Sequence, residues 1–153
     1  MSNKIADSVN QSSATEIVAH LLRADASFEP SLSSRVDIHT YAQKLQDRAV
    51  RFEAWLGEEL VGLVASYCNQ PDKGKAFVTS VSVLPECQGQ GIADRLMRQC
   101  IEHVRGLGFR QMGLEVNQHS LPAVALYQKL GFNTLRRDGS TLIMSMTLER
   151  KPR

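Results

Sequence analysis

The sequence contains few of the residues that mark a disulfide-bonded, metal-binding or membrane-spanning protein. Its three cysteines, Cys68, Cys87 and Cys100, are odd in number and show no Cys-x-x-Cys or His-paired spacing, which indicates neither a disulfide framework nor a zinc site. The four histidines also lack ligand spacing and are expected at the surface or in loops. No apolar run approaches the ~18–20 residues of a membrane span, and the polar amino terminus has no signal-peptide core. We therefore expect a cytoplasmic protein with free thiols and no bound metal.

An excess of one charge and internal repeats are also missing. Eighteen Lys and Arg face sixteen Asp and Glu, and the net charge of +2 is too small to indicate a nucleic-acid or membrane surface. No repeat or Pro/Gly/Ser-rich linker divides the 153 residues, and a hydrophobic share of 42% suffices for one core. We expect a single domain at residues 13–149, after a flexible segment at residues 1–12, with a small molecule as its ligand.

The spacing of apolar residues predicts helices and strands in alternation. Helices are expected at about residues 13–26, 36–48, 92–105 and 121–130. Six strands are expected, at about residues 50–57, 60–68, 76–84 and 111–116 and in a final hairpin at 132–148. The fold class is therefore α/β, a mixed, partly antiparallel sheet of about six strands flanked by about four helices. The pattern shows no clear strand before the first helix.

A glycine-containing turn joins the third strand to the third helix, with Gly89 and Gly91 at its centre. Such a turn directs backbone N–H groups and the positive end of the helix dipole to one point, which favours a phosphate. Glycine permits positive φ and lets a ligand approach the backbone. The P-loop string is absent, and a dinucleotide motif would need a glycine where Asp94 stands. Glu115 lies about where a ribose-binding acid would, so a nicotinamide enzyme stays open as an alternative.

The residues around this turn match two motifs of one family. Residues 88–93, QGQGIA, fit the pattern Gln/Arg-x-x-Gly-x-Gly/Ala, and SLPAVALYQKLGF follows about thirty residues later. With SVSVLPE before the turn and LEV between the motifs, the sequence resembles the GCN5-related N-acetyltransferase (GNAT) family over about residues 50–148. The resemblance implies transfer of an acetyl group from acetyl-CoA to an amine. We expect a small-molecule acceptor, with a protein amino terminus or lysine as the alternative; a homodimer is common among relatives.

The resemblance also implies which residues hold acetyl-CoA. Backbone N–H groups of the turn bind the pyrophosphate in the family, and the strand before the turn pairs with the pantetheine arm and faces the thioester oxygen. Ser120 stands where many members have asparagine, so one side-chain contact to CoA is in doubt, although serine suits a helix N-cap. The implied cofactor-binding residues are Val81, Ser82, Val83, Gln88, Gly89, Gln90, Gly91, Ile92, Ala93, Asp94, Ser120 and Tyr127.

Two residues are candidates for proton transfer. Tyr127 is similar to the tyrosine that protonates the departing CoA thiolate in the family, and a phenol is protonated at pH 7; the alternative is a tyrosine that only packs. Glu115 aligns with the base of relatives that acetylate ribosomal-protein amino termini; the alternative is a structural glutamate. Residues 77–83 carry no carboxylate, so the base that histone-modifying members have on that strand is absent. Thr79 and Ser80 could at most order a water.

The acceptor site is the least defined part of the resemblance. In the family it is walled by the two early helices and the loop after the third strand, which correspond here to residues 28–45 and 67–76. The polar and aromatic candidates there are Asp37, His39, Tyr41, Tyr67 and Asn69. A non-catalytic acyl-CoA sensor or interaction module stays open, because of the missing strand carboxylate and the serine at position 120.

Overall fold

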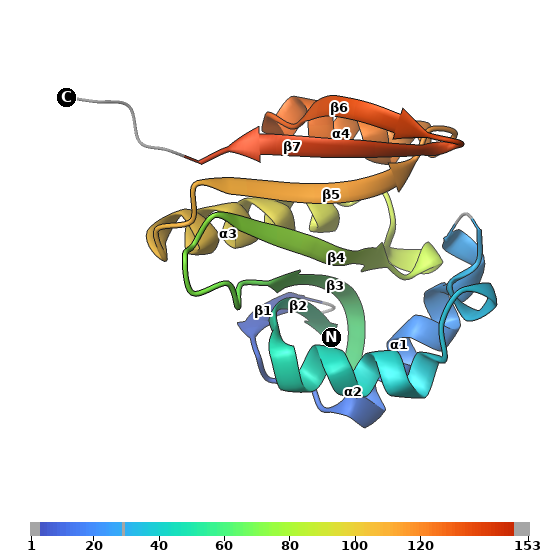
Figure 1. The fold of residues 1–153 in the computed structure, drawn as a ribbon. Coiled ribbons are helices and arrows are strands. Elements are labelled where there is room, and N and C mark those ends of the chain that lie inside the picture. Colours follow the sequence, from blue (N-terminus) through green and yellow to red (C-terminus); the bar gives the residue numbers. More distant parts are fainter. Residues whose placement is uncertain (1–3, 29, 149–153) are drawn as a thin grey trace.

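The computed structural model describes residues 4–28 and 30–148 and shows one twisted sheet between two layers of helices (Figure 1). The strands are β1 (Ile5–Val9), β2 (Ala49–Leu56), β3 (Glu59–Tyr67), β4 (Lys75–Val83), β5 (Gln111–Asn117), β6 (Asn133–Asp138) and β7 (Thr141–Thr147). Their order is β1-β2-β3-β4-β5-β7-β6, and among the described strands only β4 and β5 are parallel neighbours. The predicted class, α/β with a mixed sheet, is confirmed.

The four helices lie where the sequence predicts them. They are α1 (Ala14–Ala24), α2 (Ile38–Arg48), α3 (Ile92–Gly106) and α4 (Leu121–Leu130), with short 3-10 turns at Asp25–Ser27, Leu32–Ser34 and Pro85–Cys87. The predicted capping box is present, because the Ser13 hydroxyl accepts from the Glu16 N–H and the Glu16 carboxylate accepts from the Ser13 N–H. Within the described residues, α3 is the longest helix at 15 residues, and no helix is long and apolar enough to span a membrane.

The seventh strand, β1, is a correction to the sequence analysis. Residues 5–9 were expected in a flexible segment, but they pair antiparallel with β2 over five residues. A buried carboxylate anchors the chain that follows: Glu53 accepts hydrogen bonds from the Ser8 hydroxyl at 2.7 Å and from the Ser12 N–H at 2.8 Å. Arg51, also buried, lies 3.4 Å from Glu53 and donates to the Ser12 carbonyl. These long-range polar contacts hold β1 in the sheet.

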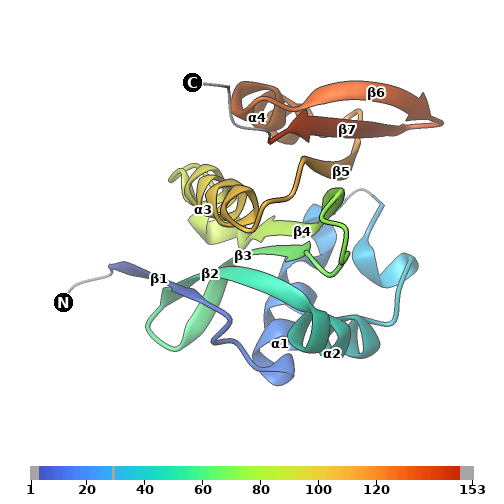
Figure 2. The same cartoon turned by 60° about the vertical axis from the view of Figure 1, so that its left-hand side comes forward.

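The helices cover the sheet unequally (Figure 2). On one face α3 and α4 bury the main core, whereas α1 and α2 pack on the other face over β3 and its neighbours. The contact between α3 and β3 is close at Gly62, where an added Cβ would lie 2.7 Å from Ile92 Cγ2. This contact fixes the first turn of α3 against the sheet. On the second face, no helix of the described residues lies over β5 and β7 (Figure 1).

Candidate active site

The parallel strands β4 and β5 separate soon after they begin. They pair only at Lys75, Ala76 and Phe77, opposite residues 111–113, and then diverge (Figure 1). On its other side β4 stays paired with β3 as far as Val83. The edge of β4 that faces β5 at residues 78–83 therefore has no strand partner, and such an edge can pair with an extended ligand. Residues 81–83, implied as pantetheine-binding, lie on it.

A β-bulge interrupts β4 just beyond the point of divergence. The register moves from Ala65 opposite Ser80 to Ser66 opposite Val78, which leaves Thr79 as the extra residue. Tyr41 of α2 holds the bulge: its hydroxyl donates to the Thr79 carbonyl at 2.9 Å and lies 2.7 Å from Thr79 Oγ1. The hydroxyl of Tyr41, a candidate for acceptor binding, therefore supports the strand.

Two further hydroxyls beside the bulge are buried and lack a hydrogen-bond partner in the described chain, Ser80 Oγ and Tyr67 Oη. Ser80 is buried, with a relative exposure of 4%. Burial raises the pKa of Tyr67, and the Lys44 ammonium lies 5.1 Å above the centre of its ring. A buried hydroxyl without a partner is costly, so these groups are suited to bind water or a polar ligand.

The glycine turn has the geometry that the sequence predicts. Gly89 and Gly91 have φ of +82° and +76°, and a Cβ at either would meet nothing within 4 Å, so the backbone angle and not crowding requires glycine. Helix α3 begins at Ile92, and no side chain caps it. Its first N–H groups have no partner within the helix and point toward the turn. This arrangement suits a pyrophosphate.

The charges next to the turn are paired. The Asp94 carboxylate accepts from Lys129 Nζ at 2.8 Å and from Arg98 Nε at 2.6 Å, and these hydrogen bonds lower the pKa of Asp94. Arg95 instead binds Asp7 of β1, with 2.7 Å between Nε and Oδ2. The three basic residues are therefore engaged with acids, and the negative charge of Asp94 in the first turn of α3 is offset by two cations.

Tyr127 lies on α4, on the face of the helix that packs on the core, and is 6% exposed. Its ring contacts Phe132 edge-on with 6.1 Å between centroids. Burial raises the pKa of Tyr127 to about 12, so it is protonated at neutral pH. Ser120 is the N-cap residue of the same helix, as predicted, but its side chain makes no capping hydrogen bond.

Glu115 is exposed on β5, between the buried Leu114 and the half-buried Val116. Because strand side chains alternate between faces, its carboxylate lies on the face away from α3 and α4. It makes no hydrogen bond to another described residue, so it has no partner of the kind that a structural glutamate would need. Glu115 and Tyr127 thus belong to opposite faces of the sheet.

The remaining acceptor candidates differ in what they do. Asp37 caps α2 by accepting from the Thr40 N–H at 3.0 Å, and Asn69 donates to the Arg48 carbonyl at 3.1 Å. Both therefore have structural contacts. His39 is exposed on α2.

His20 was expected at the surface or in a loop, but it is buried in α1. Its Nδ1–H donates to the Leu60 carbonyl at 2.8 Å, so Nε2 accepts from the Ser82 hydroxyl at 2.7 Å. Burial lowers the pKa of His20 to about 4. The available signal was its place with Ile17 and Leu21 on the apolar stripe of α1.

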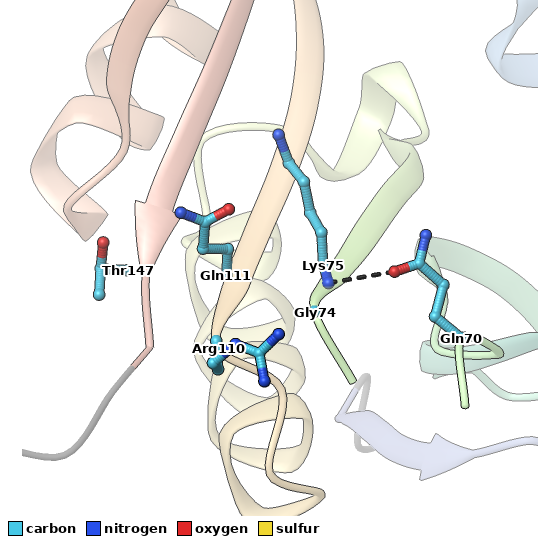
Figure 3. Close-up of a pocket in the computed structure, with 6 residues that line it drawn as sticks. All are labelled: Gln70, Gly74, Lys75, Arg110, Gln111 and Thr147. Carbon is cyan, nitrogen blue, oxygen red and sulfur yellow. Dashed lines mark hydrogen bonds between the residues drawn. The ribbon is translucent and has the colours of Figure 1, made fainter. Parts of the chain in front are cut away.

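A pocket of about 470 Å³ lies at the other end of the parallel pair, where β4 and β5 begin (Figure 3). Its lining residues come from the loop before β4, from the start of β4 and β5 and from the end of β7: Gln70, Gly74, Lys75, Arg110, Gln111 and Thr147. The pocket is on the same face of the sheet as Glu115, and two of its residues are basic.

Comparison with known proteins places these features in a family. The family model described as "Acetyltransferase (GNAT) family" matches residues 15–132. A mycothiol acetyltransferase of Corynebacterium glutamicum is 37% identical over 78 residues, which are 51% of this chain and 26% of that protein. The [ribosomal protein bS18]-alanine N-acetyltransferase of Escherichia coli is 28% identical over 101 residues, 65% of this chain and 66% of that protein. The chain thus spans about a quarter of the first relative's length.

The fold is shared with solved structures over nearly the whole chain. The PaiA N-acetyltransferase from Thermoplasma acidophilum, solved in complex with coenzyme A, superposes with a TM-score of 0.70. The match covers 93% of this chain and 99% of that one at 16% sequence identity, so it is a likeness of fold.

Proposed function

Because the chain belongs to the GNAT family of acetyltransferases, we propose that it transfers an acetyl group from acetyl-CoA to a primary amine. The observation that carries this proposal is the uncapped start of α3, which lies beside the unpaired edge of β4. The start of α3 suits a pyrophosphate, and the unpaired edge of β4 suits the extended pantetheine arm. The coenzyme A bound to the structural neighbour from Thermoplasma acidophilum supports the same ligand here.

In this proposal the backbone does most of the binding. N–H groups of residues 88–94 hold the pyrophosphate, and the edge of β4 at residues 81–83 pairs with the pantetheine arm. Ser82 is kept in place by its hydrogen bond to His20. A backbone N–H near the bulge at Thr79 can face the thioester oxygen, where negative charge develops as the amine attacks. Ser120 has no assigned contact beyond the family resemblance.

In the proposed reaction the amine attacks the thioester of acetyl-CoA directly. The neutral amine bonds to the carbonyl carbon, the C–S bond breaks, and the thiolate leaves with the bonding electrons. Tyr127 donates its proton to that sulfur and recovers one from solvent. A tyrosine whose pKa is about 12 is protonated at neutral pH, and a thiolate that leaves a thioester can accept its proton in the transition state.

Glu115 is the proposed base that removes a proton from the incoming ammonium, directly or through water. An amine of pKa about 10 arrives protonated, so this step must precede attack. The position of Glu115 on the uncovered part of the sheet is consistent with an acceptor that approaches from that face. Its lack of a structural partner also favours this role.

We propose a small-molecule acceptor. The volume of about 470 Å³ at the start of β4 and β5 is in the range of small-ligand sites. A protein acceptor is the second candidate, because the same face is open over β5 and β7 and one relative is named for a ribosomal protein. A non-catalytic acyl-CoA sensor is the candidate of another class. Acetyl transfer to any amine would exclude it.

The test is to incubate the protein with isotopically labelled acetyl-CoA and a whole-cell extract, with Tyr127→Phe and no-enzyme controls. We expect enzyme-dependent label on a metabolite, which mass spectrometry would identify. Label on a polypeptide instead would establish the protein-modifying alternative. Saturable acetyl-CoA binding without any labelled product would refute the proposed activity and support the sensor.

A further inference from the structure

The pocket at the start of β4 and β5 is built into the sheet. Lys75, Gln111 and Thr147 are paired in register across β4, β5 and β7, so their side chains form one row on the same face. Gln70 accepts a hydrogen bond from the Lys75 N–H at 3.2 Å and closes one side. Arg110, from the turn before β5, closes the lower end (Figure 3).

The charges of the pocket leave a net positive site. Neither Lys75 nor Arg110 makes an ion pair with any residue in the part of the chain that the structure describes. Among residues 4–28 and 30–148, the acid beside the pocket is Asp72, whose carboxylate accepts from the Gly74 N–H at 3.0 Å. Two cations beside one carboxylate leave about one positive charge, which matches a monoanion such as a carboxylate.

The position of Lys75 connects this charge to the proposed reaction site. Its side chain lies over Gly113 of β5, where an added Cβ would be 2.5 Å from Lys75 Cε and 3.1 Å from Nζ. Figure 3 shows the ammonium directed along β5 toward the end of the strand that carries Glu115. A larger residue at position 113 would therefore displace the end of the lysine side chain from this position.

One apolar side chain, Phe77, lies on this face beside the Lys75 ammonium. Phe77 is opposite Gly113 in the next row of the sheet and is 37% exposed. Glu115 follows two residues after Gly113 on the same face. At about 3.3 Å per residue, Glu115 lies ~7 Å from Gly113 and ~13 Å from Gln111 along the strand. The face therefore presents the Lys75 ammonium over Gly113, the ring of Phe77 beside it, and the Glu115 carboxylate two residues further along β5.

We infer that the acceptor is a small primary amine that also carries a carboxylate, about 7–13 Å from the amine along an apolar chain. The carboxylate binds the Lys75 ammonium over Gly113, Arg110 adds positive charge at the lower end of the pocket, the chain lies beside Phe77, and the amine reaches Glu115. The inference rests on the proposed acetyl transfer and assigns it a substrate class. It predicts discrimination against cationic acceptors such as diamines.

The test compares three amines that differ only at the far end: 6-aminohexanoate, hexylamine and 1,6-diaminohexane. CoA release is followed with a thiol reagent at saturating acetyl-CoA. We expect kcat/KM for 6-aminohexanoate to exceed that for hexylamine about tenfold, as a charge-assisted hydrogen bond allows. The diamine is expected to be the poorest substrate. Equal values for the three amines, or a preference for the diamine, would overturn the inference.

Substitutions in the pocket test which residues cause the preference for 6-aminohexanoate. Lys75→Met should reduce the preference for 6-aminohexanoate over hexylamine to near unity, and Lys75→Glu should shift it toward the diamine. Lys73→Met is the matched control, because the Lys73 side chain lies beside Gly108 and outside the pocket lining. Arg110→Gln serves as a second probe if a Lys75 variant does not fold, as judged by its thermal melt. A preference that persists in both Lys75→Met and Arg110→Gln would refute the site.

The inference and the proposed function fail in different ways. No enzyme-dependent product in the labelled-extract experiment would refute acetyl transfer itself. If that experiment gives a product while the three amines show no charge preference or no turnover, only the assignment of a carboxylate-bearing acceptor is wrong.

Discussion

The buried histidine gives the protein a predicted loss of stability in mild acid. His20 is 2% exposed, and both ring nitrogens are in hydrogen bonds, one to the Leu60 carbonyl and one from the Ser82 hydroxyl. Burial lowers its pKa from 6.5 to about 4, while the nearby charges of Arg23 and Glu59 act in opposite directions. In the unfolded chain the imidazole is in water and keeps a pKa near 6.5.

The direction in which stability changes with pH follows from which state, folded or unfolded, binds the proton. Between pH 6.5 and about 4 the unfolded chain is protonated at His20 and the folded chain is not, so acid favours unfolding. The stability that this neutral histidine contributes is fully present above pH 6.5 and is lost as the pH falls toward 4. At about 1.4 kcal/mol per pH unit, the total is ~3 kcal/mol. Below pH 4 the contribution no longer changes.

Urea unfolding from pH 4 to 8 measures this loss. His20→Asn keeps a donor near the position of Nδ1 but cannot titrate, so its free energy of unfolding should lack the His20 slope between pH 6.5 and 4. It should also be less stable at pH 8, because Ser82 loses its acceptor. His39→Gln, which removes an exposed histidine on α2, is the control and should follow the parent curve. Parallel curves for His20→Asn and the parent would refute the argument.

Three further predictions concern the proposed site. Tyr127→Phe should lower kcat by ~10²–10⁴-fold with little change in CoA affinity measured by calorimetry, because only the proton donor is removed; unchanged turnover would exclude Tyr127 as the acid. Glu115→Gln should lower kcat/KM and change its dependence on pH, and an unaltered rate and profile would contradict its role as base. Gly91→Val places a β-branched residue at φ +76°, so CoA affinity should fall at least tenfold, whereas Gly106→Ala in α3 should bind normally.

The sequence predicts the site where the determinants are local. The glycine turn, the start of α3 and the buried tyrosine of α4 lie in continuous segments, and each appears where the pattern places it. Strand β1 could not be found this way. Three of its five residues are exposed, and its place in the sheet depends on Glu53 and Arg51, which are more than forty residues away along the chain.

The same limit applies to polar groups that tertiary contacts bring together. His20 lies on the apolar stripe of α1, but its partner Ser82 is sixty-two residues away, so no local pattern predicts that the two are paired. The basic pocket is likewise assembled from three strands and two turns, and the Lys75 side chain lies over Gly113 of the neighbouring strand. Residue type and spacing predict elements and turns, whereas side-chain partners across the sheet depend on register.

The two early helices support the proposed active site through one strand. Helix α1 holds Ser82 by its hydrogen bond to His20, and α2 holds the bulge through Tyr41 and Thr79. Both contacts reach β4 within residues 78–83, the edge proposed to bind the pantetheine arm. The two helices that the family resemblance implies as walls of the acceptor site therefore also position the strand proposed to face the thioester. It follows that substitutions in α1 or α2 that change acceptor choice will alter kcat as well as KM, because they move the same backbone.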